Sequence, residues 1–284
     1  IEYVNTLGDM EDAVAMNKLL EKEKKRFKGN ELEGKTLGII GLGAIGSMVA
    51  DTALNLGMNV VGYDPSLSVE SAWRLSSEIR KIDNIVSLIS RSDYITLHLP
   101  VLDSTRNLVN HELLANVRQG AVLMNFSREE IVDTEAVVDA LDSGCLAKYI
   151  ADFPTPRLIR KKGAILMPHI GASTDEAEEN CAVMAACQLK DFLENGNIKN
   201  SVNFPMLHLE RSGVRLSISN RNVPKILGSI LAILADENIN IIDMLNKSRE
   251  EIAYNLIDVD VRPSEVVLKN LLAIEGVANV RLID

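Results

Sequence analysis

One short segment restricts the fold of this 284-residue chain more than any other feature. Residues 38–46 read GIIGLGAIG and overlap an apolar run that predicts a strand over residues 36–41. A helical stretch at 44–56 comes next, and a second apolar run at 59–63 ends at Asp64. A glycine triplet alone is common, but a strand, a tight turn, a helix, a strand and an acidic residue in this order predict a βαβ unit that binds a dinucleotide. The alternative is a strand-turn-helix without a ligand.

Each glycine of this turn, and the acidic residue after it, has its own physical role. Gly41 permits the tight turn, Gly43 lets a pyrophosphate approach the backbone, and Gly46 lets the helix pack close to the strand. The amino end of the helix offers free N–H groups and a partial positive charge to the phosphates. Asp64 can accept hydrogen bonds from both ribose hydroxyls and would repel a 2′-phosphate, so the expected cofactor is NAD rather than NADP.

Composition argues against several classes of partner. The formal net charge of −10 at pH 7 argues against a nucleic-acid partner. No apolar run is long enough to span a membrane, and the cysteines do not have the spacing of metal ligands. We therefore expect a cytoplasmic protein with reduced thiols, no membrane partner and no metal site. The cysteines are Cys145, Cys181 and Cys187.

The order of the predicted elements indicates an α/β fold. A charged amphipathic helix over residues 8–28 comes first. Between residues 29 and 172, apolar strands alternate with helical stretches, which is typical of a Rossmann-type doubly wound parallel sheet. The strands are expected at 36–41, 59–63, 94–98, 121–125, 148–152 and 164–167, and the helices between them include 44–56, 69–80, 110–117 and 133–143.

The sequence changes character after Pro168. A helix over residues 173–194 starts with a hydroxyl cap and an acidic first turn, and together with a polar linker it fills residues 173–210. Residues 211–284 predict a small α+β unit with the order βαββαβ and both helices on one face of the sheet. Its strands are expected at 214–219, 239–246, 253–261 and 277–282, and its helices at 223–237 and 264–274.

Four polar residues fall at the carboxyl ends of the predicted parallel strands, where ligands bind in such sheets. His169, beside a nicotinamide, can remove a hydroxyl proton as hydride leaves the carbon. Arg128 can hold a carboxylate through two parallel N–H bonds, so the pair suits a 2-hydroxy acid. The alternatives are a structural histidine at a strand end and an arginine in a surface ion pair. Of the other two residues, Asp152 ends a strand, and His98 is expected to be a wall of the cofactor pocket or a buried partner rather than catalytic.

Five motifs occur in an order that resembles the D-isomer-specific 2-hydroxyacid dehydrogenases. In addition, residues 211–284 resemble an ACT domain, a small regulatory module that binds amino acids. The likeness covers nearly the whole chain. The motifs are Gly-Leu-Gly-Ala-Ile-Gly at 41–46, Asp64, Asn-Phe-Ser-Arg at 125–128, Asp-Phe-Pro-Thr-Pro at 152–156 and Pro-His-Ile-Gly-Ala-Ser-Thr at 168–174.

The resemblance implies a role for each matching residue. His169 is the expected acid and base, Arg128 holds the carboxylate, and Asp152 meets the carboxamide of the nicotinamide. The ACT-like unit would bind serine between two paired copies, although turn chemistry alone also explains asparagines at these positions. The residues expected on NAD are Gly41, Gly43, Ala44, Ile45, Gly46, Asp64, Phe126, Ser127, Arg128, Asp152, His169, Gly171 and Ala172, and those expected on serine are Asn220, Asn222 and Asn240.

The same resemblance implies a substrate and an assembly. An ACT-like unit on a member of this family implies NAD-dependent oxidation of 3-phosphoglycerate to 3-phosphohydroxypyruvate, the first step of L-serine biosynthesis. The chain is expected to form a homodimer or homotetramer. Two alternatives are a dehydrogenase of another D-2-hydroxy acid and a regulatory protein that binds NAD and an amino acid without catalysis.

Two features depart from the family pattern. Many members carry a glutamate just after the Asp-x-Phe stretch that orients the histidine, and the segment 152–156 contains none. Asp152 or a water molecule is expected to take over that role. Residues 1–28 match only the end of a substrate domain of about a hundred residues, so the chain is expected to be a fragment that binds NAD and turns over poorly.

Overall fold

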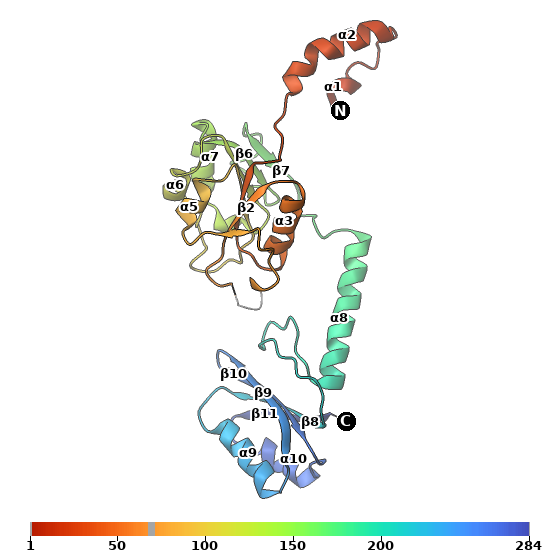
Figure 1. The fold of residues 1–284 in the computed structure, drawn as a ribbon, viewed down its shortest axis with the longest axis vertical. Coiled ribbons are helices and arrows are strands. Elements are labelled where there is room, and N and C mark those ends of the chain that lie inside the picture. Colours follow the sequence, from red (N-terminus) through yellow and green to blue (C-terminus); the bar gives the residue numbers. More distant parts are fainter. Residues whose placement is uncertain (1, 68–71, 284) are drawn as a thin grey trace. The chain divides into compact units, whose positions relative to one another are not determined.

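The structure, a computed structural model, describes residues 2–67 and 72–283 (Figure 1). The chain divides into two compact units, Ile1–Ile170 and Gly171–Asp284. Each unit has its own sheet and its own apolar core, so the two are described separately. The finer division at residues 28, 172 and 210 remains a prediction.

A parallel sheet forms the centre of the N-terminal unit. Within the described residues it has seven strands in the order β3-β2-β1-β4-β5-β6-β7. β1 pairs with β2 on one side and with β4 on the other, so the order of winding reverses at β1. This confirms the predicted doubly wound sheet, in which ligands bind at the reversal point. The strands are β1 (Thr36–Ile40), β2 (Asn59–Tyr63), β3 (Arg80–Lys81), β4 (Tyr94–Leu97), β5 (Ala121–Asn125), β6 (Leu146–Ala151) and β7 (Ala164–Leu166).

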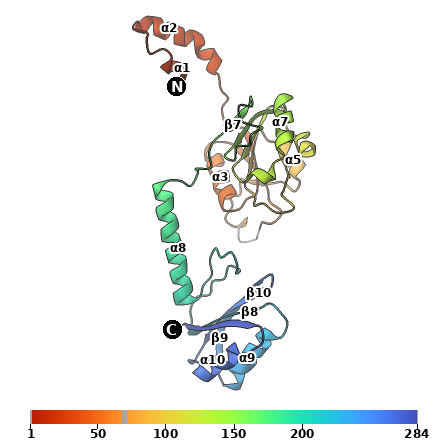
Figure 2. The same ribbon diagram turned by 180° about the vertical axis from the view of Figure 1, so that it is seen from behind.

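Helices cover both faces of this sheet (Figures 1 and 2). α3 lies on one face, and α5, α6 and α7 lie on the other. Leu37 and Ile39 pack in the core under α3, whereas Ile40 belongs to the core on the opposite face. The helices are α1 (Glu2–Asn5), α2 (Ala13–Glu23), α3 (Ala44–Asn55), α5 (Ile85–Ile89), α6 (His111–Leu114) and α7 (Thr134–Asp142), with short 3₁₀ turns η1 (Lys24–Phe27) and η2 (Glu129–Ile131).

Side-chain oxygens fix where several helices begin. Asp12 accepts hydrogen bonds from the first N–H groups of α2, Asn84 does so for α5, and Asp133 does so for α7. Each cap satisfies donors that have no partner inside the helix. α3 differs, because its first flanking residue is Gly43, which has no side chain to serve as a cap.

Three helix predictions in this unit were wrong in extent. Residues 73–79 form turns and bends rather than part of a helix over 69–80, and residues 68–71 lie outside the described residues. Ser76 Oγ accepts a hydrogen bond from the Glu78 N–H, a local turn that competes with helix formation. α2 starts at Ala13 rather than at residue 8, since Asp12 caps it there, and α6 covers only part of 110–117.

The C-terminal unit begins with the long helix α8 and continues into an antiparallel sheet. Among the described residues this sheet has four strands in the order β11-β8-β10-β9. α9 and α10 lie on the same face of it (Figures 1 and 2), and their apolar side chains form a core with β8 and β10. The predicted βαββαβ order is confirmed. The elements are α8 (Asp175–Asn195), β8 (Val214–Arg221), α9 (Ile226–Asp236), β9 (Ile241–Arg249), β10 (Ile252–Val259), α10 (Glu265–Leu272) and β11 (Val277–Ile283).

Polar contacts attach the carboxyl end of α8 to this sheet. Arg215 and Asp258 form a fully buried two-point ion pair, with Nε–Oδ1 2.6 Å and Nη2–Oδ2 2.8 Å, and Arg215 Nη1 donates to the Asn195 carbonyl at 3.0 Å. Arg281 Nη2 donates to the Leu193 carbonyl at 2.9 Å, where a cation offsets the partial negative charge of a helix end. Burial raises the pKa of Asp258, but the hydrogen bonds from Arg215 and Ser212 together lower it below its usual value.

Candidate functional site

The glycine-rich turn lies between the carboxyl ends of β1 and β4. Gly41 has a φ of +95°, and a Cβ there would lie 2.3 Å from the His98 carbonyl oxygen. A Cβ on Gly46 would lie 2.0 Å from the Gly41 carbonyl oxygen, so the start of α3 packs directly on the turn. A Cβ on Gly43 would meet nothing within 4 Å. Gly41 and Gly46 are therefore required by the fold, whereas the space beside Gly43 is open to a ligand.

The carboxylate of Asp64 faces the backbone of the glycine-rich turn. Its Oδ2 accepts a hydrogen bond from the Leu42 N–H at 2.9 Å, and its Oδ1 accepts one from the Ser66 N–H at 2.9 Å. A carboxylate can accept about four hydrogen bonds, so each oxygen keeps one site for a ribose hydroxyl. The two backbone donors fix the orientation of the carboxylate before any ligand binds.

A cleft of about 430 Å³ opens beside this turn. Ile45, one of its lining residues, is 60% exposed, so its side chain is accessible to a bound ligand. Burial lowers the pKa of His98, so its ring is neutral near pH 7. The lining residues are Gly43, Ala44, Ile45, His98, Leu99, Pro100, Val101, Phe126, Ser127 and Arg128. Sequence reasoning did not identify Leu99, Pro100 and Val101, although a proline three residues after the end of β4 marks a loop at this edge.

The loop after β5 contains three of the predicted site residues, and hydrogen bonds of Asn125 and Ser127 fix its conformation. Asn125 is fully buried, and it accepts a hydrogen bond from the Ser127 N–H and donates one to the Arg128 carbonyl. Ser127 Oγ donates to the Leu97 carbonyl at 2.6 Å and accepts from the Leu99 N–H at 3.0 Å. The Ser127 hydroxyl thus ties two loops together, which leaves Phe126 and Arg128 as the exposed side chains of this segment.

Two buried polar atoms at the end of β6 lack partners. Asp152 Oδ1 and Thr155 Oγ1 make no hydrogen bond within the described part of the chain. Asp152 is 9% exposed and Thr155 is 7% exposed. A buried acceptor without a donor is costly, so Asp152 is suited to receive an N–H from a bound carboxamide. This free acceptor and the open space at Gly43 both fit a nicotinamide dinucleotide.

His169 and Arg128 both contact one aromatic ring, that of Phe153. The His169 and Phe153 ring centroids are 4.5 Å apart at an interplanar angle of 80°. Arg128 Cζ lies 5.5 Å from the centroid of the Phe153 ring, and Arg128 Nη1 donates to the Ser127 carbonyl at 2.7 Å. Both polar side chains are exposed and available to a ligand. Phe153 lies in the Asp-Phe-Pro-Thr-Pro motif at 152–156, but its contact with both residues could not be predicted from that motif.

The remaining predicted residues do not all converge. Gly171 and Ala172 follow His169 in an exposed turn. Asn220 is buried in β8, whereas Asn240 precedes β9, and the pairing of both strands with β10 places them at opposite ends of the sheet. Asn222 donates to the Glu250 carbonyl at 3.0 Å, near the Asn220 end. A single chain therefore does not bring the three asparagines together, and the serine site remains a prediction that needs two copies.

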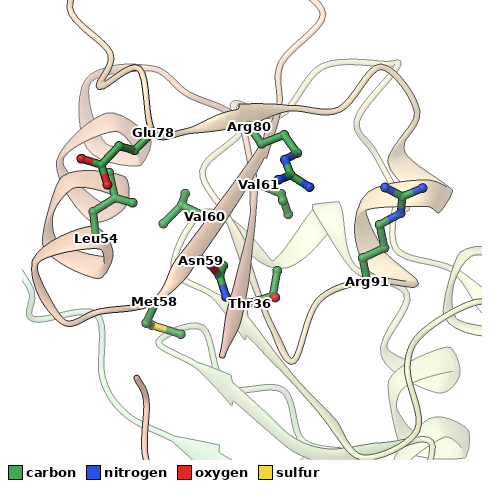
Figure 3. A pocket seen from close by; sticks show the side chains of 9 residues that line it. All are labelled: Thr36, Leu54, Met58, Asn59, Val60, Val61, Glu78, Arg80 and Arg91. Atoms are coloured by element: carbon green, nitrogen blue, oxygen red, sulfur yellow. The ribbon is translucent and has the colours of Figure 1, made fainter. Parts of the chain in front are cut away.

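A second hollow of similar volume, about 420 Å³, lies elsewhere in the N-terminal unit (Figure 3). Thr36 and Asn59, the first residues of β1 and β2, line it, so it opens at the amino ends of the strands. Arg80 and Arg91 extend into it from one side, and Glu78 lies on the other side near Leu54 (Figure 3). Ligands of such sheets bind at the carboxyl ends, so position rather than volume identifies the cleft beside Gly43 as the candidate site.

The described residues contain neither a cluster of metal-ligating side chains nor a helix that could cross a membrane. No group of three or more His, Cys, Asp and Glu side chains there is placed to hold a metal ion. No helix in the part of the chain described here has the length and apolar character needed to cross a membrane.

The sequence matches one family model over the whole of the N-terminal unit. Residues 1–171 match the NAD-binding domain of the D-isomer specific 2-hydroxyacid dehydrogenases. This range contains the glycine turn, Asp64, Arg128, Asp152 and His169.

Similar sequences include two proteins named D-3-phosphoglycerate dehydrogenase. The one from Haemophilus influenzae is 35% identical over 273 residues, which cover 92% of this chain and 65% of that protein. The one from Methanocaldococcus jannaschii is 34% identical over 278 residues, which cover 96% of this chain and 51% of that protein. The chain thus spans between about half and two thirds of the length of these relatives.

Solved structures with a similar fold belong to the same class of enzyme. A glyoxylate reductase from Paecilomyes thermophila has a TM-score of 0.55 and 31% identity, covering 61% of this chain and 54% of its own. The NAD-complexed form of a D-isomer specific 2-hydroxyacid dehydrogenase from Lactobacillus delbrueckii has a TM-score of 0.54 and 25% identity, covering 63% of this chain and 59% of its own.

Proposed function

Because the chain belongs to the D-isomer specific 2-hydroxyacid dehydrogenase family and contains its NAD-binding domain, we propose that it takes part in NAD-dependent oxidation of a D-2-hydroxy acid. The observation that carries this proposal is the meeting of a histidine and an arginine around one ring at the carboxyl edge of the sheet. An imidazole and a guanidinium are the two groups needed to accept a hydroxyl proton and to hold the neighbouring carboxylate.

The chain's own residues divide the work of the reaction. NAD, when bound, supplies the acceptor for the hydride that leaves C2 of the substrate. His169 accepts the proton of the C2 hydroxyl, and Arg128 holds the substrate carboxylate so that C2 faces the cofactor. Asp152 Oδ1, which has no donor of its own within the described residues, would accept an N–H of the nicotinamide carboxamide and so help to hold the cofactor.

The substrate that we propose is 3-phosphoglycerate, and the product is 3-phosphohydroxypyruvate. Relatives at 34% and 35% identity that carry the name D-3-phosphoglycerate dehydrogenase support this choice. The C-terminal unit is proposed to be an ACT-like regulatory domain that binds serine between two copies, in a homodimer or homotetramer. Its βαββαβ order with both helices on one face supports that proposal.

A variant of His169 tests the proposed chemistry. We expect His169→Gln to lower kcat for 3-phosphoglycerate oxidation by about 100-fold or more, because general base catalysis contributes roughly 10²–10⁴-fold. NAD affinity, measured by calorimetry, should change little, since the residues of the glycine turn are intact. Activity of the variant within tenfold of the parent would remove His169 from this role, and a panel of D-2-hydroxy acids would show whether another substrate is preferred.

A non-catalytic function is the second candidate. No carboxylate oxygen lies within 4.0 Å of the His169 ring nitrogens in the described residues, so the imidazole lacks the partner that orients it in many family members. In this alternative the chain binds NAD without turnover. Calorimetric NAD binding with no NADH formed from any D-2-hydroxy acid would favour it.

A further inference from the structure

The strand order explains why one side chain can contact both candidate catalytic residues. Arg128 follows β5, Phe153 follows β6, and His169 follows β7, and these three strands are neighbours in the sheet. Adjacent strands lie about 4.8 Å apart, so the strands before Arg128 and His169 are separated by about 10 Å. Phe153 starts from the strand between them and fills that interval.

The two contacts of the Phe153 ring differ in kind. The His169 ring meets it at 80° with 4.5 Å between centroids, an edge-to-face geometry that favours one orientation of the imidazole. The Arg128 guanidinium carbon lies 5.5 Å from the ring centroid, within the range of a cation–π contact. One aromatic ring therefore restricts the rotation of both polar side chains.

Arg128 is restrained at a second point, which determines what it offers to a ligand. Its Nη1 donates to the Ser127 carbonyl at 2.7 Å, and Ser127 is itself buried and tied to the loop after β4. The remaining N–H groups of the guanidinium, at Nε and Nη2, form one edge that can bind a carboxylate through two bonds. Phe153 and the Ser127 carbonyl together set the direction of that edge.

From this geometry we propose that Phe153 is a positioning residue, which holds the His169 imidazole and the Arg128 guanidinium at the spacing that a 2-hydroxy carboxylate needs. This inference rests on the proposed function. The ring takes the place of a carboxylate partner for His169, since the described residues include none within 4.0 Å. Phe153 touches the two polar residues and is not required to touch the reacting atoms.

A set of three variants tests this proposal without requiring turnover. Phe153→Leu removes the ring, Phe153→Tyr keeps it, and Phe27→Leu makes the same change on an exposed phenylalanine outside the cleft. The chain has four histidines, and the signals lost in His169→Gln identify those of His169 in the NMR spectrum of the ligand-free chain. These His169 ring protons should shift in Phe153→Leu as the ring current is lost. They should stay in place in Phe153→Tyr and Phe27→Leu. Unmoved His169 resonances in Phe153→Leu overturn the proposal.

Steady-state kinetics with D-2-hydroxy acids provide a second test of the positioning role of Phe153. Phe153→Leu should lower kcat, through His169, and raise KM, through Arg128, for a combined loss of roughly three- to tenfold in kcat/KM. Phe153→Tyr should restore both, whereas a residue that only fills space would be replaced equally well by leucine. Parent-like kinetics in a folded Phe153→Leu overturn the positioning role even if the resonances shift. If Phe153→Leu does not fold, Phe153→Met removes the ring with a flexible side chain of similar volume.

The NMR and kinetic measurements distinguish failure of this inference from failure of the proposed function on which it rests. A parent chain that forms no NADH from any D-2-hydroxy acid contradicts the proposed function. The His169 resonances still report whether Phe153 orients the imidazole in that case.

Discussion

At the scale of single residues, the three glycines of the turn have different surroundings. A Cβ on Gly46 would lie 2.0 Å from the Gly41 carbonyl oxygen, which cannot move without displacing the turn. A Cβ on Gly43 would meet no atom within 4 Å. Gly46 is therefore needed for the packing of the fold, whereas Gly43 leaves space for a ligand, although only two residues lie between them.

Alanine at each position should give opposite results. We expect Gly46→Ala to lower the free energy of unfolding by about 2–3 kcal/mol, because the new methyl group overpacks the junction of β1 and α3. Gly43→Ala should leave the denaturant midpoint nearly unchanged and weaken NAD binding at least tenfold, because the methyl group occupies the space that the pyrophosphate needs. Urea unfolding and calorimetry measure the two effects. Equal NAD affinity for Gly43→Ala and the parent would contradict the assignment of that space.

The roles of some site residues could be predicted from the sequence, whereas the contacts of others could not. The roles of Gly41 and Gly46 follow from local stereochemistry, so their spacing was enough to predict them. The contacts of Phe153 depend on β6 lying between β5 and β7, which is a property of the sheet and not of any short segment. Ser127 was expected on the cofactor, and the partners of its hydroxyl, Leu97 at the end of β4 and Leu99 in the loop that follows, could not be predicted from the sequence around it.

At the scale of elements, the buried pair Arg215–Asp258 joins the end of α8 to β8 and β10. Asp258→Asn should lower the free energy of unfolding of the C-terminal unit by roughly 3–5 kcal/mol, because it leaves a buried guanidinium without its charge partner. Chemical denaturation monitored by circular dichroism measures the loss. A double variant, Arg215→Met with Asp258→Leu, serves as the matched control and should recover much of it, since no unpaired charge then remains.

The same pair gives a pH dependence with a defined sign. Hydrogen bonds from Arg215 and Ser212 hold the pKa of Asp258 below that of an unfolded chain, so the unfolded state binds more protons at low pH. The stabilisation is complete above the unfolded pKa of about 3.9 and is lost as pH falls through the lower, folded pKa. The C-terminal unit should therefore lose stability below about pH 4 more steeply in the parent than in Asp258→Asn. An equal slope for both would contradict this assignment.

Helices and strands were predictable where the hydrophobic periodicity and the residues at their ends indicated the same boundaries. The strand over residues 59–63 was predicted with its observed bounds because Gly57 ends the preceding helical stretch and Asp64 ends the apolar run. The helix expected over 69–80 was wrong over residues 73–80, since the Ser76 side chain makes a local turn and Arg80 joins the edge of the sheet beside Val61. Edge strands of two residues leave almost no periodic signal, so β3 could not be found from the sequence.

At the scale of the whole molecule, two units with separate cores should unfold separately. We expect differential scanning calorimetry to resolve two transitions. NAD at a hundredfold excess over its Kd should stabilise only the unit of residues 1–170, by about 2.7 kcal/mol, because the proposed binding cleft lies within that unit. AMP, which carries the ribose hydroxyls but no nicotinamide, serves as a weaker control. A single transition, or an equal shift of both, would contradict this division.

The carboxyl end of α8 is attached to the C-terminal sheet, and this attachment has a mechanical consequence. A helix of 21 residues is about 32 Å long, and its carboxyl end is held to the C-terminal sheet by Arg215, Arg281 and the Tyr254 hydroxyl. Its amino end starts six residues after His169. A tilt of the sheet by about 5° would swing the far end of such a rod by about 3 Å. A small tilt of the C-terminal sheet is thereby amplified along the length of α8 within this unit.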